Sequence, residues 1–183
     1  MRLTRRVSVI CVLAAVCVGT NYMLSILPNV NLMDLVVFIA GYCFGFATGS
    51  MIAVLSWLVY GAVNPYGFSP PIFITTVLCE MIYSAFGSIA RRHDLIRIRG
   101  GSGKRRYVSV EAGALGFLST LLYDLPTNAI CGPLWYHRDS LVESVAIALI
   151  VGIPFAVVHQ VSNFVIFLLC AVPSITGVMR ALR

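Results

Sequence analysis

Charged side chains are scarce in this chain. Asp, Glu, Lys and Arg together make up 11% of its 183 residues, whereas soluble domains carry roughly 25%. Hydrophobic residues make up 59%, and the mean hydropathy is +0.91. This composition excludes an ordinary soluble domain. It predicts an all-α, polytopic membrane protein, because long apolar runs rather than short alternating segments fill the sequence.

Motifs for metal, nucleotide and nucleophile chemistry are also missing. The six cysteines form no C-x-x-C pair, and they lie in or beside apolar runs, where small packing residues are expected. Cys131, next to an outer loop, is the one cysteine to watch for reactivity. Neither an H-E-x-x-H motif nor a Gly-rich phosphate-binding loop is present. We therefore expect no metal, no cofactor and no enzymatic activity of the chain itself.

The apolar runs predict six membrane spans within one domain, residues 1–183. The first follows Arg5 and Arg6, and we interpret it as a retained helix because it exceeds a signal-peptide core. The second and third are short and meet at a Gly-rich bend around Gly45 and Gly49. The sixth is too long for one straight crossing, so we expect a kink at Gly152 and Pro154 or first turns along the interface. The spans are Val7–Leu27, Leu32–Phe46, Thr48–Val63, Ile72–Ala90, Val108–Ile130 and Val142–Val172.

The distribution of basic residues predicts the orientation of these spans. Of the 13 Lys and Arg residues, twelve lie at the N-terminus, at the C-terminus or in a loop at residues 91–107, and only Arg138 lies elsewhere. With both termini in the cytoplasm, six crossings put all twelve on the cytoplasmic side, in agreement with the positive-inside rule. The same rule explains the basic loop better than nucleic-acid binding does, because no aromatic residues alternate with its charges.

Ionisable residues within membrane spans are costly, and they are therefore candidates for function. Asn128 follows Asp124 by four positions, and Asn163 follows His159 by four positions. This spacing places the two members of each pair on one helical face. The polar faces of the fifth and sixth spans should thus turn toward each other or toward a wet cavity that opens to the outside. The ionisable candidates are Asp34, Glu80, Asp124 and His159, and the amides are Asn128 and Asn163.

Structural roles are the alternative for several of these residues. Asn128 and Asn163 could serve as interhelical hydrogen-bond donors, and His159 as a packing histidine. Asp34 could simply cap the second helix. Tyr66, Phe68, Trp135 and Tyr136 in the outer loops could anchor the membrane interface or cover a ligand.

Small residues recur at helical spacing in the first span. Cys11, Ala15 and Gly19 form one stripe. Such stripes allow helices to approach closely, so this face could contact another membrane subunit.

The ordered set of segments resembles the S components, or substrate-binding subunits, of energy-coupling factor (ECF) transporters. The resemblance rests on the six-span pattern and on four segments, which are Pro28-Asn-Val-Asn-Leu-Met-Asp34, Asn64-Pro-Tyr-Gly-Phe-Ser-Pro-Pro71, Tyr123-Asp-Leu-Pro-Thr-Asn128 and His159-Gln-Val-Ser-Asn163. It implies capture of a vitamin or related micronutrient from outside the cell, with ATP hydrolysis left to partner subunits. It also implies lid loops at Pro28–Asn31 and Asn64–Pro71, and docking of the Cys11, Ala15 and Gly19 stripe on a coupling subunit, with Gly19 replacing the usual second Ala.

We therefore expect a multi-pass protein of a prokaryotic plasma membrane that captures a vitamin-like molecule for an ECF coupling subunit and its cytoplasmic ATPase pair. An ATP-independent permease, an intramembrane enzyme and a purely structural subunit remain alternatives. The polar set favours a neutral or partly cationic ligand over a polyanion, and nucleic acid is not an expected partner. The candidate binding residues are Asp34, Glu80, Asp124, Asn128, His159 and Asn163, with Asn64 and Tyr66 in a lid.

Overall fold

The computed structural model describes residues 3–63, 68–98 and 108–182. Within these ranges the chain is helical, with six α-helices and no strand. Each predicted span corresponds to one helix, although most ends differ by a few residues. The helices are α1 (Leu3–Leu24), α2 (Met33–Phe44), α3 (Phe46–Ala62), α4 (Pro70–Arg92), α5 (Val110–Trp135) and α6 (Leu141–Ala181).

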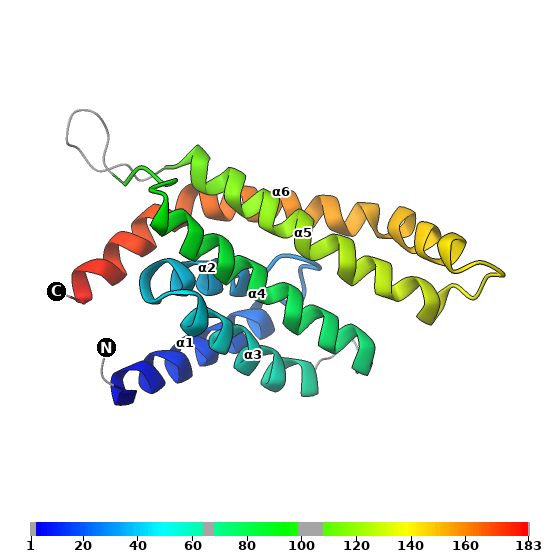
Figure 1. Ribbon diagram of the computed structural model, residues 1–183, viewed down its shortest axis with the longest axis horizontal. Helices are drawn as coiled ribbons and strands as arrows, with labels where there is room; N and C mark the ends of the chain where they lie inside the picture. The colour runs from blue at the N-terminus through cyan, green and yellow to red at the C-terminus, as the bar shows by residue number, and fades with distance from the viewer. Residues whose placement is uncertain (1–2, 64–67, 99–107, 183) are drawn as a thin grey trace.

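Successive helices run in alternating directions (Figure 1). The start of α1, the end of α4, the start of α5 and the end of α6 lie at the same end of the molecule, while the α5–α6 connection lies at the opposite end. Helices α5 and α6 pack side by side along much of their length. The short helix α2 contacts α1, α3, α4 and α6, and nine of its 12 residues are buried. It therefore forms the centre of the fold.

Glycines determine how closely α2, α3 and α4 approach. Gly45 has φ +89° and separates α2 from α3, a conformation that L side chains rarely adopt. Gly49, which the sequence also suggested for this bend, lies inside α3, where a Cβ would collide with Ser84 of α4. The Oγ of Ser84 donates to the Phe46 carbonyl at 2.8 Å. The tight bend thus belongs to Gly45, and Gly49 serves helix packing.

The prolines of α5 and α6 do not end their helices. Pro126 and Pro133 lie inside α5, and Pro154 and Pro173 lie inside α6. Helix α6 is continuous over 41 residues, and its last turns, drawn in red, bend away from the rest (Figure 1). The change of direction that is visible in Figure 1 therefore lies in these last turns, and the kink expected at Gly152 and Pro154 stays a prediction.

The outer surface of the helices is strongly apolar. Val12 of α1, Leu78 of α4 and Ile150 of α6 are each 60% or more exposed, at 61%, 60% and 65%. Apolar surface on this scale is unfavourable in water and favourable in lipid. Helices α1, α4 and α6 are long and apolar enough to cross a membrane, whereas α2 and α3 are shorter apolar helices. The fold is thus compatible with a membrane protein.

Candidate functional site

His159 of α6 joins two carboxylates from two other helices. Its Nε2 lies 2.8 Å from Oδ2 of Asp34 on α2, and its Nδ1 lies 2.8 Å from Oδ1 of Asp124 on α5. All three side chains are buried. The polar faces of α5 and α6 therefore meet through Asp124 and His159, and α2 completes the contact.

Asn163 extends this arrangement by one helical turn. Its Nδ2 donates to Oδ2 of Asp34 and lies 2.8 Å from Oγ1 of Thr120 on α5 and 3.3 Å from the Tyr83 hydroxyl on α4. The Tyr83 hydroxyl in turn donates to Thr120 Oγ1 at 3.0 Å. Four helices thus share one buried polar network, which locks their relative positions because each lost partner would leave a buried polar group unpaired.

The geometry at His159 requires an extra proton. An ionised carboxylate only accepts hydrogen bonds, and a neutral imidazole donates from only one of its two nitrogens. Both ring nitrogens of His159 face carboxylate oxygens. Either the ring is therefore an imidazolium, or Asp34 or Asp124 carries a proton.

Glu80 adds a third buried carboxylate. It is 1% exposed, and its Oε2 accepts from the indole Nε1 of Trp57 at 3.2 Å. Its Oε1 has no hydrogen-bond partner among the described residues, and neither has Oδ2 of Asp124. No group of three or more His, Cys, Asp or Glu in the described ranges is arranged to hold a metal ion. Three buried carboxyl groups, those of Asp34, Glu80 and Asp124, therefore share one buried imidazole, that of His159.

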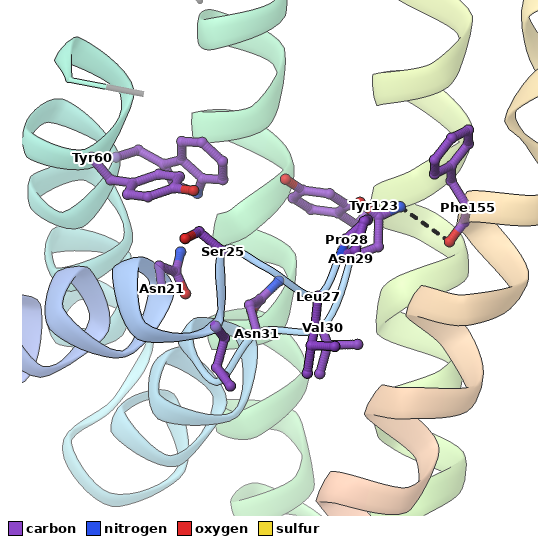
Figure 2. Close-up of a pocket in the computed structure, with 12 residues that line it drawn as sticks. Asn21, Ser25, Leu27, Pro28, Asn29, Val30, Asn31, Tyr60, Tyr123 and Phe155 are labelled. Atoms are coloured by element: carbon purple, nitrogen blue, oxygen red, sulfur yellow. Dashed lines mark hydrogen bonds between the residues drawn. The ribbon is translucent and has the colours of Figure 1, made fainter. Parts of the chain in front are cut away.

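A cavity of about 320 Å³ lies beside this network (Figure 2). Figure 2 shows Tyr60 of α3 and Tyr123 of α5 on opposite sides, with Asn21 of α1 below Tyr60 and the α1–α2 linker between Asn21 and Tyr123. No described residue that lines the cavity carries a charge. The lining consists of Asn21, Leu24, Ser25, Leu27, Pro28, Asn29, Val30, Asn31, Trp57, Tyr60, Tyr123 and Phe155.

Three residues connect the cavity wall to the buried acids. Trp57 donates to Glu80. Tyr123 packs edge-on against the His159 ring, with ring centroids 5.5 Å apart. Asn31 accepts from the backbone N–H of Asp34 through its Oδ1 at 3.4 Å. Asp34 thus does not cap its helix through its side chain, which faces His159 instead.

The α1–α2 linker is fastened to α6 through Asn29. Its Nδ2 donates to the Phe155 carbonyl at 3.1 Å, and its own carbonyl accepts from Ser162 Oγ at 3.3 Å. Asn29 has φ +57°, a left-handed conformation that Asn tolerates better than most residues. The linker, including the predicted lid at Pro28–Asn31, therefore forms one wall of the cavity.

The predicted site residues fall into three groups. Asp34, Asp124, His159 and Asn163 share the network, and Glu80 reaches the cavity through Trp57. Asn128 is outside the network: it lies against Gly152 of α6 in a second, largely apolar groove that Asp124 also lines. Asn64 and Tyr66 lie outside the described residues. Whether any of these residues binds a ligand stays a prediction.

Sequence reasoning missed most of the cavity lining. Asn21 is an amide within the first apolar run and is 7% exposed, but it is not among the residues predicted from the sequence. Trp57, Tyr60 and Tyr123 were likewise not recognised, because aromatic residues are ordinary components of apolar helices. Only the polarity of Asn21 offered a usable signal.

The small-residue stripe of α1 lies on the exterior. Cys11, Ala15 and Gly19 are exposed, and a Cβ at Gly19 would meet nothing within 4 Å. This face is therefore open in the isolated chain.

Comparison with protein-family models, with curated proteins and with solved structures found no match in any of the three.

Proposed function

We propose that this chain is the membrane-embedded substrate-capture subunit of an ECF-type uptake transporter for a vitamin or related micronutrient. The observation that supports this best is the cavity itself. Aromatic side chains from three helices and amides from α1 and its linker surround it, a combination typical of sites for small organic ligands. The adjacent network supplies buried polar groups that can hold the helices in place around a ligand.

The proposed topology has six crossings of a prokaryotic plasma membrane, with both termini in the cytoplasm. It is supported by the alternating helix directions and by the start of α1 and the end of α6 lying at the same end of the molecule as the end of α4 and the start of α5. It also gathers twelve of 13 basic residues on the cytoplasmic side. The longer helices would then separate the short helices α2 and α3 from part of the surrounding lipid.

The proposed partners are an ECF transmembrane coupling subunit and a pair of cytoplasmic ATPases. The exposed stripe at Cys11, Ala15 and Gly19 supports docking, because a helix with small residues can approach a partner closely. The chain would bind its ligand without catalysing a reaction.

An ATP-independent permease is the second candidate, and one observation favours it. Asp34, His159 and Asp124 form a chain of titratable groups across three helices, and such chains occur in proton relays of transporters. In that case uptake would depend on a proton gradient rather than on ATPase partners.

Uptake in cells separates the two candidates. The chain is expressed in a bacterial host with and without a co-expressed ECF coupling module, and small molecules that co-purify with it are identified by mass spectrometry. The ECF proposal expects a vitamin-like compound to co-purify and uptake to require the module. Uptake without the module that a protonophore abolishes would favour the permease. Absence of both a bound compound and uptake would reject both candidates.

A further inference from the structure

The electrostatic surroundings of the cavity suggest the charge of its ligand. Three carboxylates, Asp34, Glu80 and Asp124, are buried next to it, and His159 is the one basic side chain in their network. The cluster thus holds three acidic side chains and one basic one. In the low dielectric of a buried site, uncompensated charge is costly and its field reaches neighbouring groups.

The cavity wall offers nothing that would favour an anion. Its described lining contains no Lys or Arg. The basic residues of the chain lie at the termini and in the 91–107 loop, except for Arg138 in the α5–α6 linker. A carboxylate ligand would therefore enter a site with excess acid and no cationic partner, which disfavours it.

The aromatic side chains of the cavity also favour a cationic ligand over an anionic one. Trp57 and Tyr60 pack edge-to-face with ring centroids 5.7 Å apart, and Tyr123 lies across the cavity from Tyr60. Aromatic faces attract cations, Trp most strongly. They also stack on flat rings. Trp57 is at the same time hydrogen-bonded to Glu80, so a cation on its ring would lie close to that carboxylate.

Asn21 supplies an independent polar signal. Its side chain lines the cavity and is 7% exposed, and its Oδ1 has no hydrogen-bond partner among the described residues. A buried carbonyl oxygen without a donor is unfavourable. This oxygen is itself shielded, so a ligand that brings an N–H group would satisfy it once the amide turns toward the cavity.

The size of the cavity limits the ligand. About 320 Å³ is at the small end of the range of roughly 300–1,000 Å³ found for ligand pockets. It suits a ligand of one or two rings better than a large fused system.

We propose that the cavity selects a small, flat heteroaromatic ligand that carries a positive charge and an N–H donor, with Asn21 accepting from the ligand and Trp57 stacking on it. This inference rests on the proposed capture function and specifies its ligand class. It assigns direct ligand contact to Asn21 and Trp57. Glu80 acts through Trp57, from whose indole N–H it accepts a hydrogen bond.

The two tryptophans of the chain make the test selective. Trp57 lines the cavity, whereas Trp135 ends α5 and is 64% exposed. In a Trp135→Phe background, quenching of the remaining indole fluorescence reports on the cavity. Three probes share one ring and differ in charge: 1-methylnicotinamide is a cation, nicotinamide is neutral and nicotinate is an anion. Thiamine and pyridoxamine serve as further cations, and biotin and pantothenate as further carboxylates.

We expect at least one cationic probe to bind at micromolar to low millimolar concentration. We also expect 1-methylnicotinamide to bind about tenfold or more tightly than nicotinate. Asn21→Leu should weaken thiamine or pyridoxamine binding about tenfold, the loss typical of an unsatisfied hydrogen bond. Thr20→Val is the matched control, because Thr20 neighbours Asn21 on α1 but does not line the cavity.

Failure of this inference can be told from failure of the proposed function. If biotin, pantothenate or nicotinate binds as tightly as the cations, the charge assignment is overturned while a capture function stands. If binding is cationic but Asn21→Leu and Thr20→Val behave alike, the assigned role of Asn21 is wrong. If no probe binds and no compound co-purifies, both the inference and the capture function are rejected.

Discussion

The Nε2 of His159 lies 2.8 Å from Oδ2 of Asp34, although 125 positions separate the two residues in the chain. The contact joins α6 to α2, the most buried helix of the fold. Because Asp124 of α5 approaches the other ring nitrogen, one side chain connects three helices. The imidazole therefore ties α2 to α5 and α6, two of the helices that line the cavity.

Removing that imidazole should destabilise the protein strongly. His159→Ala leaves Asp34 and Asp124 as buried carboxylates without their shared partner, a change that costs about 3–5 kcal/mol when a buried ion pair is broken. We expect a large drop in the thermal unfolding midpoint of the purified protein in detergent. His137→Ala is the control, because His137 is exposed in the α5–α6 linker. Equal midpoints for the two variants would contradict the central role of His159.

A side chain at Gly87 should force α2 and α4 apart. A Cβ there would collide with the backbone carbonyl of Phe38 on α2. Overpacking of this kind costs about 1–3 kcal/mol, so Gly87→Ala should lower the unfolding midpoint despite the better helix propensity of Ala. Gly177→Ala on α6 should not, because nothing lies within 4 Å of a Cβ at that position. A Gly87→Ala protein as stable as the Gly177→Ala protein would show that the helices do not pack this closely.

Much of the helical architecture could be predicted from the sequence. Each of the six apolar runs forms a helix, because apolar length is a local property. Two four-residue spacings and the cost of isolated charge in an apolar interior predicted that the polar faces of the fifth and sixth spans meet each other or a wet cavity, but not the contact of Asp124 with His159 itself. Helix ends were less accurate: α5 continues through Pro126 and Pro133 to Trp135, because neighbouring helices can support an interior proline.

The cavity could not be predicted in the same way. It forms where residues from α1, its linker, α3, α5 and α6 converge, and convergence depends on packing that no single segment encodes. Asn128 illustrates the limit. Its four-residue spacing from Asp124 placed both on the side of α5 that faces α6, and both do line one α5–α6 groove, but only Asp124 also reaches the His159 network.

The linker bond of Asn29 should control the mobility of the cavity wall. Asn29→Asp keeps the size of the side chain and much of its tolerance for φ +57°, but it removes the N–H that donates to the Phe155 carbonyl. Loss of a hydrogen bond worth about 1 kcal/mol predicts roughly fivefold faster local opening. Hydrogen exchange measured by mass spectrometry should show faster exchange in residues 25–31, with α2 unchanged as the internal reference. Unchanged exchange in the linker would mean that the Asn29 bond does not fasten it.

The exposed stripe of α1 offers a direct test of the proposed partner. Ala15→Leu adds bulk where a coupling subunit would approach closely. If the chain is an S component, ATP-driven uptake and co-purification with the coupling module should fall at least tenfold, while ligand binding by the isolated protein stays unchanged, because Ala15 does not line the cavity.

Val16→Leu is the matched control for this prediction. Val16 is the next residue on the same helix and is 43% exposed, but it lies about 100° around the helix axis from Ala15. Its enlargement should leave complex formation intact. If Ala15→Leu and Val16→Leu both support full uptake, the stripe is not the docking face, and a permease that works alone becomes the better explanation.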